Sequence, residues 1–217
     1  MGNEFRIFIN FKTYLQGTGA NAIKLAQICE QVSQGKKTEI IPIVQVADVY
    51  PVKQAVGIPV WVQHIDPVLP GKTTGFVTLE SVIEAGASGT LLNHSEHQIP
   101  PGTIKQVLAR AKNLQTMVAA KTLGQLERLV KLKPDYIAYE IADLIGGKVS
   151  ITDASPKSIE KALKIAGEVP LIVGAGVNKA EDLSKARKLG ARGVLIASAV
   201  VLAEDPKGNL LELLKLL

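Results

Sequence analysis

The sequence predicts an α/β fold, most simply a closed (β/α)8 barrel formed by a single domain over residues 1–217. Two observations favour this fold. Short β-branched runs alternate with longer stretches of helical periodicity, and the alternation recurs eight times along the chain. Each β-like run is almost continuously apolar, which is typical of parallel strands that are covered by helices. An open, doubly wound sheet is the alternative arrangement.

Eight runs have the composition of buried strands and are bounded by turn-forming or polar residues. In chain order they are Phe5–Asn10, Glu39–Val44, Val60–His64, Gly89–Asn93, Gln115–Ala119, Tyr136–Glu140, Val169–Gly174 and Gly193–Ala197. If all of them run parallel, each needs a crossover segment before the next strand, and the intervening stretches are long enough for helices.

The stretches between these runs carry apolar residues at three- and four-residue steps, which predicts helices with one buried face. They are Asn21–Gln34, Leu79–Ala85, Thr103–Lys112, Leu123–Lys131, Pro156–Ala166, Lys179–Leu189 and Leu210–Leu217, with Asp48–Ala55 as a weaker eighth because Pro51 interrupts it. Ser155 before Pro156 is a typical helix start, and Gly190 after Leu189 is a typical stop.

The composition excludes several classes of protein. Of the 217 residues, 47% are apolar and 21% charged, which excludes a disordered chain. The longest apolar runs, such as 194–203, are about half of the ~20 residues that a membrane span needs. The first residues lack the pattern of a secretory signal, and no linker or shift in composition divides the chain. We therefore expect one domain, no membrane association and a cytoplasmic location.

The single cysteine and the charge distribution narrow the class of ligand. Cys29 cannot form an internal disulfide, and it falls on one helical stripe with apolar neighbours, which predicts a core residue. The net charge of +5 comes from 25 basic and 20 acidic residues spread along the chain. Such a dispersed excess favours small anionic substrates, whereas nucleic-acid binding would favour a clustered basic patch with exposed aromatic residues.

In a (β/α)8 barrel, functional residues lie at the carboxyl ends of the strands. Polar or phosphate-compatible groups occupy most of these positions: Asn10 and Lys12, Gln63 and His64, the run 93–96, Tyr139 and Glu140, the run 174–176, and Ala197 and Ser198. Lys12, His94 and Glu140 follow three different strands, yet all three would face the same end of the barrel.

The same motifs carry a resemblance to a known family. They are Asn10-Phe11-Lys12-Thr13-Tyr14, Asn93-His94-Ser95-Glu96, Tyr139-Glu140 followed by the run 143–147, Gly174-Ala175-Gly176-Val177, and Ala197-Ser198. In order and strand placement this set resembles the triosephosphate isomerase family in its short archaeal form, across essentially the whole chain. The resemblance implies a TIM barrel that interconverts dihydroxyacetone phosphate and glyceraldehyde 3-phosphate in glycolysis and gluconeogenesis.

The resemblance implies a role for each of three residues, and the chemistry agrees. Glu140 would remove a proton from a carbon next to a carbonyl, which a carboxylate with a raised pKa can do at neutral pH. His94 and Lys12 would stabilise the developing oxyanion. The family is itself a standard example of a glutamate base working with a neutral histidine. Because Ser95 and Glu96 can begin a helical turn, their N–H groups would disfavour a charged His94.

For the phosphate, the resemblance implies backbone donors after the last two strands at Gly176, Ala197 and Ser198, with Asn10 and Lys12 also contacting substrate. Ile145 and Gly146 would close over the substrate from a mobile lid that excludes water. Glu96 would either orient Lys12 or cap the next helix. His64 and His97 are expected to be structural.

Two departures from the family pattern bear on this site. Ile141 follows Glu140 where the family usually has proline, so closure of the lid would be less preorganised. Ala199 stands where the family has glycine beside the phosphate donors, which is harmless if φ is negative there and weakens phosphate binding if φ is positive.

No metal or other cofactor is expected. Asp66, Asp143 and Glu140 form the nearest approach to a carboxylate metal site, but no ligand pairs occur at the spacing that one element requires. The alternatives are a Schiff-base aldolase, which would need a lysine where Glu140 stands, and a non-catalytic scaffold that binds sugar phosphates. The family forms dimers and tetramers, so a homodimer or homotetramer is expected, with Thr74-Gly75 entering the neighbouring subunit near Lys12.

Overall fold

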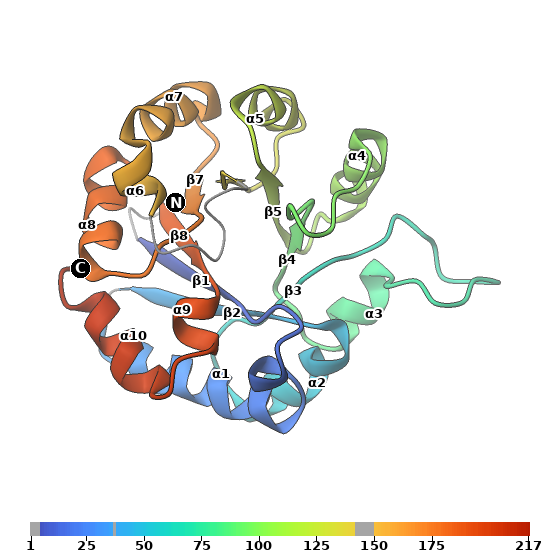
Figure 1. The fold of residues 1–217 in the computed structure, drawn as a ribbon. Coiled ribbons are helices and arrows are strands. Elements are labelled where there is room, and N and C mark those ends of the chain that lie inside the picture. The colour runs from blue at the N-terminus through green and yellow to red at the C-terminus, as the bar shows by residue number, and fades with distance from the viewer. Residues whose placement is uncertain (1–4, 37, 142–149) are drawn as a thin grey trace.

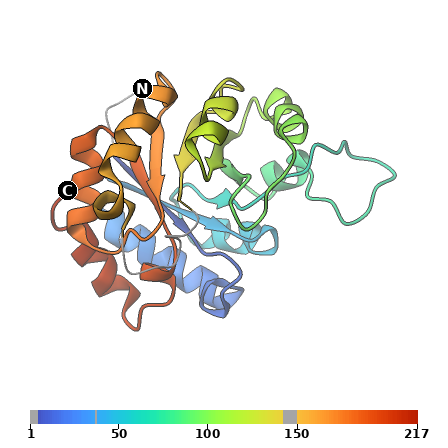
Figure 2. The ribbon, with the colours of Figure 1, turned by 45° about the horizontal axis from the view of Figure 1, so that its top comes forward.

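The computed structural model describes residues 5–36, 38–141 and 150–217 and forms a closed barrel of eight parallel strands in sequential order. The helices surround the barrel on its outside, and the segment before α3 projects away from it (Figures 1 and 2). The strands are β1 (Arg6–Asn10), β2 (Glu39–Val44), β3 (Trp61–Val62), β4 (Gly89–Leu92), β5 (Gln115–Ala120), β6 (Tyr136–Tyr139), β7 (Leu171–Gly174) and β8 (Gly193–Ile196). Pairing of β1 with β8 closes the barrel, with Arg6 opposite Gly193. The open-sheet alternative is therefore wrong.

The helical elements are η1 (Leu15–Gly17), α1 (Ala20–Ser33), α2 (Val46–Ala55), α3 (Leu79–Glu84), α4 (Pro101–Arg110), α5 (Leu123–Val130), α6 (Ile151–Ala154), α7 (Pro156–Ala166), α8 (Ala180–Leu189), α9 (Ser198–Val201) and α10 (Pro206–Leu214). The weak prediction over 48–55 is confirmed as α2, which contains Pro51 in its interior and begins two residues earlier than predicted. Three short elements, η1, α6 and α9, were not predicted, since three or four residues carry no helical periodicity.

The predicted strands all exist, but several ends differ. The third strand spans only two residues, because the chain pairs with β2 and β4 only at Trp61 and Val62. The last helix begins four residues earlier than predicted. Asp205 accepts a hydrogen bond from the Gly208 N–H and Pro206 occupies the first turn, a start signal that the apolar periodicity alone did not reveal.

The core has two layers. Outside the strands, α1 buries the predicted stripe that includes Cys29, and burial raises the pKa of that thiol to about 12, so the core interpretation is confirmed. Inside the barrel, the rings of Phe8, Trp61 and Tyr136 lie with centroids 4.9 to 5.9 Å apart. A Cβ at Gly89 would lie 2.1 Å from the Trp61 ring, so glycine makes room for the indole.

Local end signals are largely confirmed. Gly190 ends α8 in the left-handed conformation, at φ 107°. Ser155 is the N-cap of α7 with Pro156 following, although its hydroxyl contacts the Ser158 hydroxyl and not the helix backbone. Within the described ranges, no helix is both long and apolar enough to cross a membrane.

Candidate active site

A cavity of about 210 Å³ opens at the carboxyl ends of the strands. Most of the residues that the sequence predicted for the site line it: Asn10, Lys12, His94, Glu140, Gly176, Ala197 and Ser198. They come from β1, β4, β6, β7 and β8 or from the loops that follow these strands. Ile145 and Gly146, predicted for the lid, lie outside the described residues. The barrel therefore brings together side chains from five separate parts of the sequence.

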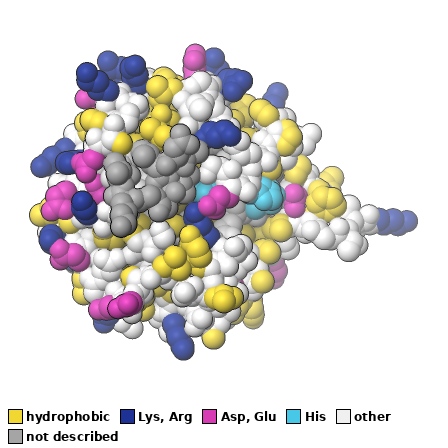
Figure 3. All heavy atoms as spheres, viewed as in Figure 1, with side chains coloured by type: hydrophobic (Ala, Val, Ile, Leu, Met, Phe, Trp, Pro, Cys, Tyr) yellow, Lys and Arg dark blue, Asp and Glu magenta, His cyan; other side chains and the backbone are white. Residues whose placement is uncertain are grey.

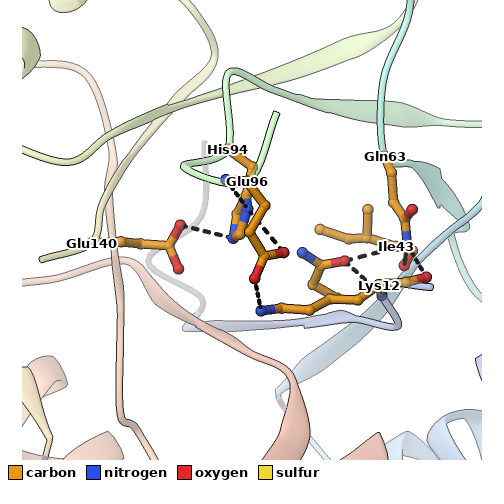
Figure 4. Close-up of polar contacts among 7 residues, drawn as sticks. Lys12, Ile43, Gln63, His94, Glu96 and Glu140 are labelled. Carbon is orange, nitrogen blue, oxygen red and sulfur yellow. Dashed lines mark hydrogen bonds and ion pairs between the residues drawn. The ribbon is translucent and has the colours of Figure 1, made fainter. Parts of the chain in front are cut away.

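Lys12 lies immediately after β1 in a left-handed backbone conformation, at φ 51°. This conformation is uncommon for a residue with a Cβ, and its neighbours hold it in place. The Lys12 N–H donates to Asn10 Oδ1 at 3.0 Å, and Gln63 Nε2 donates to the Lys12 carbonyl at 2.8 Å and to Asn10 Oδ1 at 3.3 Å (Figure 4). From the sequence, Gln63 was expected at a strand end, with no role in the site.

The Lys12 ammonium points across the cavity to Glu96, with Nζ 2.6 Å from Oε1 (Figure 4). The lysine side chain is only 12% exposed, whereas the glutamate side chain is 55% exposed. Of the two roles considered for Glu96, the geometry agrees with orienting Lys12. The next helix, α4, begins at Pro101 with Pro100 as its N-cap, so Glu96 does not cap it.

His94 is buried, and its two ring nitrogens have different partners. The Glu96 N–H donates to Nδ1 at 3.3 Å, so in the neutral ring the hydrogen lies on Nε2, which faces Glu140. Residues 94–97 form a turn closed by the His97 N–H on the His94 carbonyl, and not the start of a helix. Burial lowers the pKa of His94 and nearby Lys12 adds to this, while the Glu96 carboxylate opposes it. The imidazole is thus held neutral.

Glu140 follows β6 directly and is buried. Its Oε2 lies 3.3 Å from His94 Nε2 without hydrogen-bond alignment, so no described residue donates a hydrogen bond to that oxygen. Burial raises the pKa of Glu140 to about 7, with Lys12 lowering it and Glu96 raising it by smaller amounts. A carboxylate with this pKa is suited to take up a proton near neutral pH.

The Glu140 carboxylate occupies space that Gly174, at the end of β7, leaves open. A Cβ at Gly174 would lie 2.6 Å from both Cγ and Oε1 of Glu140. From the sequence, Gly174 was expected in the phosphate-compatible run 174–176, and its contact with Glu140 was not foreseen. In a sequence, a glycine that makes room for a catalytic side chain looks the same as a glycine in an ordinary strand-to-helix turn.

The opposite wall of the cavity is backbone. Ala175 and Gly176 both have left-handed φ, 76° and 68°, and Ala197 and Ser198 lie at the first turn of α9. Small side chains here let a ligand approach the main chain closely. Ala199 lies inside α9 and is not among the residues of positive φ, so alanine costs nothing in backbone strain at that position.

Asp66 and Glu140, two of the three carboxylates considered for a metal site, have separate partners. Asp66 accepts the Val77 N–H and contacts His64, and Asp143 lies outside the described residues. Among the residues that the structure describes, no three His, Cys, Asp or Glu side chains are arranged to hold a metal ion.

Comparison with known proteins agrees with this geometry. A family model described as triosephosphate isomerase matches residues 5–115 and 103–217. The chain is 40% identical to the triosephosphate isomerase of Methanosarcina barkeri over 223 residues, covering 100% of both chains. It is 40% identical to that of Methanosarcina acetivorans, again over the full length of both, and 39% identical to that of Methanobacterium bryantii over 95% of this chain and 94% of the other.

Proposed function

The chain belongs to the triosephosphate isomerase family and is an aldose–ketose isomerase that interconverts dihydroxyacetone phosphate and D-glyceraldehyde 3-phosphate, and we propose that Glu140, His94 and Lys12 carry this reaction. The observation that carries the proposal is the meeting of a buried carboxylate and a buried imidazole, 3.3 Å apart, in a cavity that also holds the Lys12 ammonium. The reaction moves one proton between adjacent carbons, with no net oxidation, and needs no cofactor.

Glu140 is the base in this proposal. It takes a proton from the hydroxymethyl carbon of dihydroxyacetone phosphate, which leaves an enediolate, and returns a proton to the neighbouring carbon. The isomerisation is complete when the former carbonyl oxygen has also gained a proton and the former hydroxymethyl oxygen has lost its own. The pKa of about 7 supports this role, because a base whose pKa lies near the working pH is both available and strong enough. The absence of a hydrogen-bond donor at Oε2 among the described residues leaves that oxygen free to receive the proton.

His94 and Lys12 stabilise the negative charge that appears on the substrate oxygen as the proton leaves. A neutral imidazole with hydrogen on Nε2 can donate a hydrogen bond to that oxygen directly. Lys12 supplies the nearby positive charge, and Glu96 holds its ammonium in the cavity until substrate arrives. These roles agree with the lowered pKa of His94.

The phosphate group is proposed to bind at the backbone wall formed by Gly176, Ala197 and Ser198, with Asn10 at the edge of the same cavity. Ile145 and Gly146 complete the substrate contacts on the pattern of the family. The dispersed positive charge of the protein, visible as Lys and Arg side chains spread around the rim in Figure 3, favours approach of the dianion.

We further propose that the protein is one domain, works in the cytoplasm and assembles as a homodimer or homotetramer. Support for assembly comes from exposed apolar side chains on η1, on α2 and in the projecting segment. They are Leu15, Val46, Tyr50, Leu69 and Phe76, of which Leu15 is 80% and Leu69 66% exposed. Contact with a second copy would remove these side chains from water. Sedimentation equilibrium of the wild type and of Leu69→Asp tests this.

A coupled isomerase assay with glyceraldehyde 3-phosphate tests the residue assignments. Wild-type protein is expected to turn over substrate. Glu140→Gln keeps the shape of the side chain but cannot accept the proton, so its kcat should be about 10²–10⁴-fold lower. Turnover by Glu140→Gln at the wild-type rate would remove Glu140 as the base. Covalent attachment of substrate to the protein after borohydride reduction would favour the Schiff-base alternative. Binding of a phosphate analogue without turnover would favour the scaffold.

A further inference from the structure

Asn93 comes between the end of β4 and His94, and it is one of the four non-glycine residues of positive φ in the described part of the chain. Its φ is 60°, and its side chain is buried, at 3% exposure. Asparagine tolerates the left-handed conformation better than most residues that carry a Cβ. The left-handed turn directs the chain away from the barrel wall directly before His94.

The Asn93 amide then bridges two separate pieces of backbone. Its Nδ2 donates to the Ala119 carbonyl on β5 at 2.8 Å, and its Oδ1 accepts the Ile99 N–H at 3.0 Å. Leu92 is the last residue of β4 in register with β5, opposite Val118. The side chain thus continues the contact between the two strands after their backbone ladder has ended, and it closes the loop formed by residues 94–98.

That loop carries the groups on which the tautomer of His94 depends, including the Glu96 carboxylate, whose Oε2 lies 3.6 Å from Nδ1. The ring itself belongs to the residue after Asn93, and the N–H that occupies its Nδ1 belongs to Glu96. A backbone N–H at Nδ1 is compatible only with hydrogen on Nε2, the nitrogen that faces Glu140. A small displacement of the loop would separate the Glu96 N–H from Nδ1, because their contact of 3.3 Å is already long.

We propose that Asn93 is a positioning residue for the isomerisation: its left-handed backbone and its bridging amide hold the His94 ring and the Glu96 N–H in the register that keeps the hydrogen on Nε2. Asn93 does not line the cavity, so it acts through His94. The inference rests on the proposed function, since it assumes that His94 donates to the substrate oxygen.

The test combines kinetics with ¹⁵N NMR of the histidine rings. The chain has three histidines, so the ring spectra are simple, and His94→Gln assigns the signals of interest. Asn93→Gly keeps the backbone free to adopt positive φ but removes the amide. It is expected to lower kcat about 10- to 100-fold with KM changed less than about threefold, and to shift the His94 nitrogens away from the pattern of a single Nε2–H tautomer. Asn93→Ala is expected to lower kcat by the same factor. It should also melt at a lower temperature than Asn93→Gly, because alanine disfavours positive φ.

Lys133→Gly is the matched control, since Lys133 has φ 55° but lies in the loop before β6, at the other end of the barrel. It should keep the wild-type kcat and ring spectrum. If Asn93→Gly does not fold, Asn93→Asp replaces it, because aspartate keeps the acceptor for Ile99 and puts a second carboxylate oxygen in place of the donor to Ala119. The same loss of kcat and the same direction of ring shift are expected.

Wild-type kcat in Asn93→Gly, or a loss of kcat with unchanged His94 ring signals, would overturn the inference. Failure of the proposed function looks different: the wild type would be inactive, or His94→Gln would be as active as the wild type. The ring spectrum needs no turnover, so the two failures remain distinguishable.

Discussion

The two ends of the barrel differ in how their polar groups are satisfied. Cavities of about 650 and 690 Å³ open at the amino-terminal end, each larger than the cavity of about 210 Å³ at the carboxyl end. Carboxylates there have partners: Asp135 accepts both the N–H and the hydroxyl of Thr116, and Glu39 pairs with Arg6 at 2.7 Å. At the carboxyl end, Glu140 is buried with no hydrogen-bond donor to Oε2 from any described residue.

Backbone strain is divided in the same way. Of the four non-glycine residues with positive φ in the described part of the chain, Lys12, Asn93 and Ala175 lie at the carboxyl end and only Lys133 lies at the other. Below the active-site cavity, the aromatic cluster of Phe8, Trp61 and Tyr136 fills the barrel interior. The comparison teaches that a desolvated charge and a strained backbone mark the site better than cavity size does.

The largest expected difference in activity is between substitutions of Lys12 and Lys133, two lysines of similar backbone conformation. Lys12→Met should lower kcat/KM about 10²–10³-fold or more, because it removes the cation proposed to stabilise the developing oxyanion. Lys133→Met, with φ 55° at the opposite end, should leave kcat/KM unchanged. Steady-state kinetics in both directions measures the difference. Equal activity of the two variants would break the functional contrast between the ends.

A second pair compares two glycines. Gly174→Ala should lower kcat about 10- to 100-fold, since the new Cβ displaces a carboxylate that lies 2.6 Å away. Gly124→Ala adds the same methyl group in α5, where no atom lies within 4 Å, and should keep the wild-type kcat. Initial rates and a crystal structure of Gly174→Ala provide the check. Unchanged kcat in Gly174→Ala would mean that the base tolerates a shift of this size.

The pH dependence sharpens the comparison further. Glu140, the proposed base, must be ionised to take up a proton, so kcat/KM should fall about tenfold per pH unit below about pH 7. The substrate phosphate ionises near about pH 6, so ¹³C NMR titration of the free enzyme is needed to assign the pKa to Glu140. A midpoint near 4.5 in that titration would contradict the effect of burial.

The same raised pKa has a consequence for stability. The folded state holds the Glu140 proton more tightly than the unfolded state does, so its contribution to stability is complete below pH 4.5 and is lost as the pH rises through about 7. The melting temperature of the wild type should therefore fall over this range relative to Glu140→Gln. If the melting temperatures of the two proteins changed equally with pH, no such linkage would exist.

The smallest effect on activity is expected inside the barrel. Gly89→Ala places a methyl group 2.1 Å from the Trp61 ring and should destabilise the fold by about 1–3 kcal/mol. The active-site residues are untouched, so kcat per folded molecule should stay at the wild-type value. Denaturant unfolding and an active-site-titrated assay measure the two quantities. A fall in kcat would show that packing of the aromatic cluster reaches the catalytic end.

Local patterns in the sequence predicted a large part of this protein. The alternation of apolar strands with amphipathic helices predicted the barrel, and the buried stripe of α1, including Cys29, was predicted residue by residue. Lys12, His94 and Glu140 were predicted to face the same end of the barrel because parallel strands place their carboxyl ends together, and all three line one cavity there. Strand ends were less accurate, as at β3, because pairing with neighbours decides where a strand stops.

The tertiary structure decided what each of those residues is able to do. Lys12 and Glu96 are 84 positions apart, and their ion pair exists only because the barrel closes. The raised pKa of Glu140 comes from burial by several elements, the space for its carboxylate comes from Gly174, and the tethers on Lys12 and His94 come from Gln63 and Asn93. The sequence by itself determined which chemical groups meet at one end of the barrel. Their ionisation and orientation depend on desolvation and on hydrogen bonds between distant segments, which only the folded chain provides.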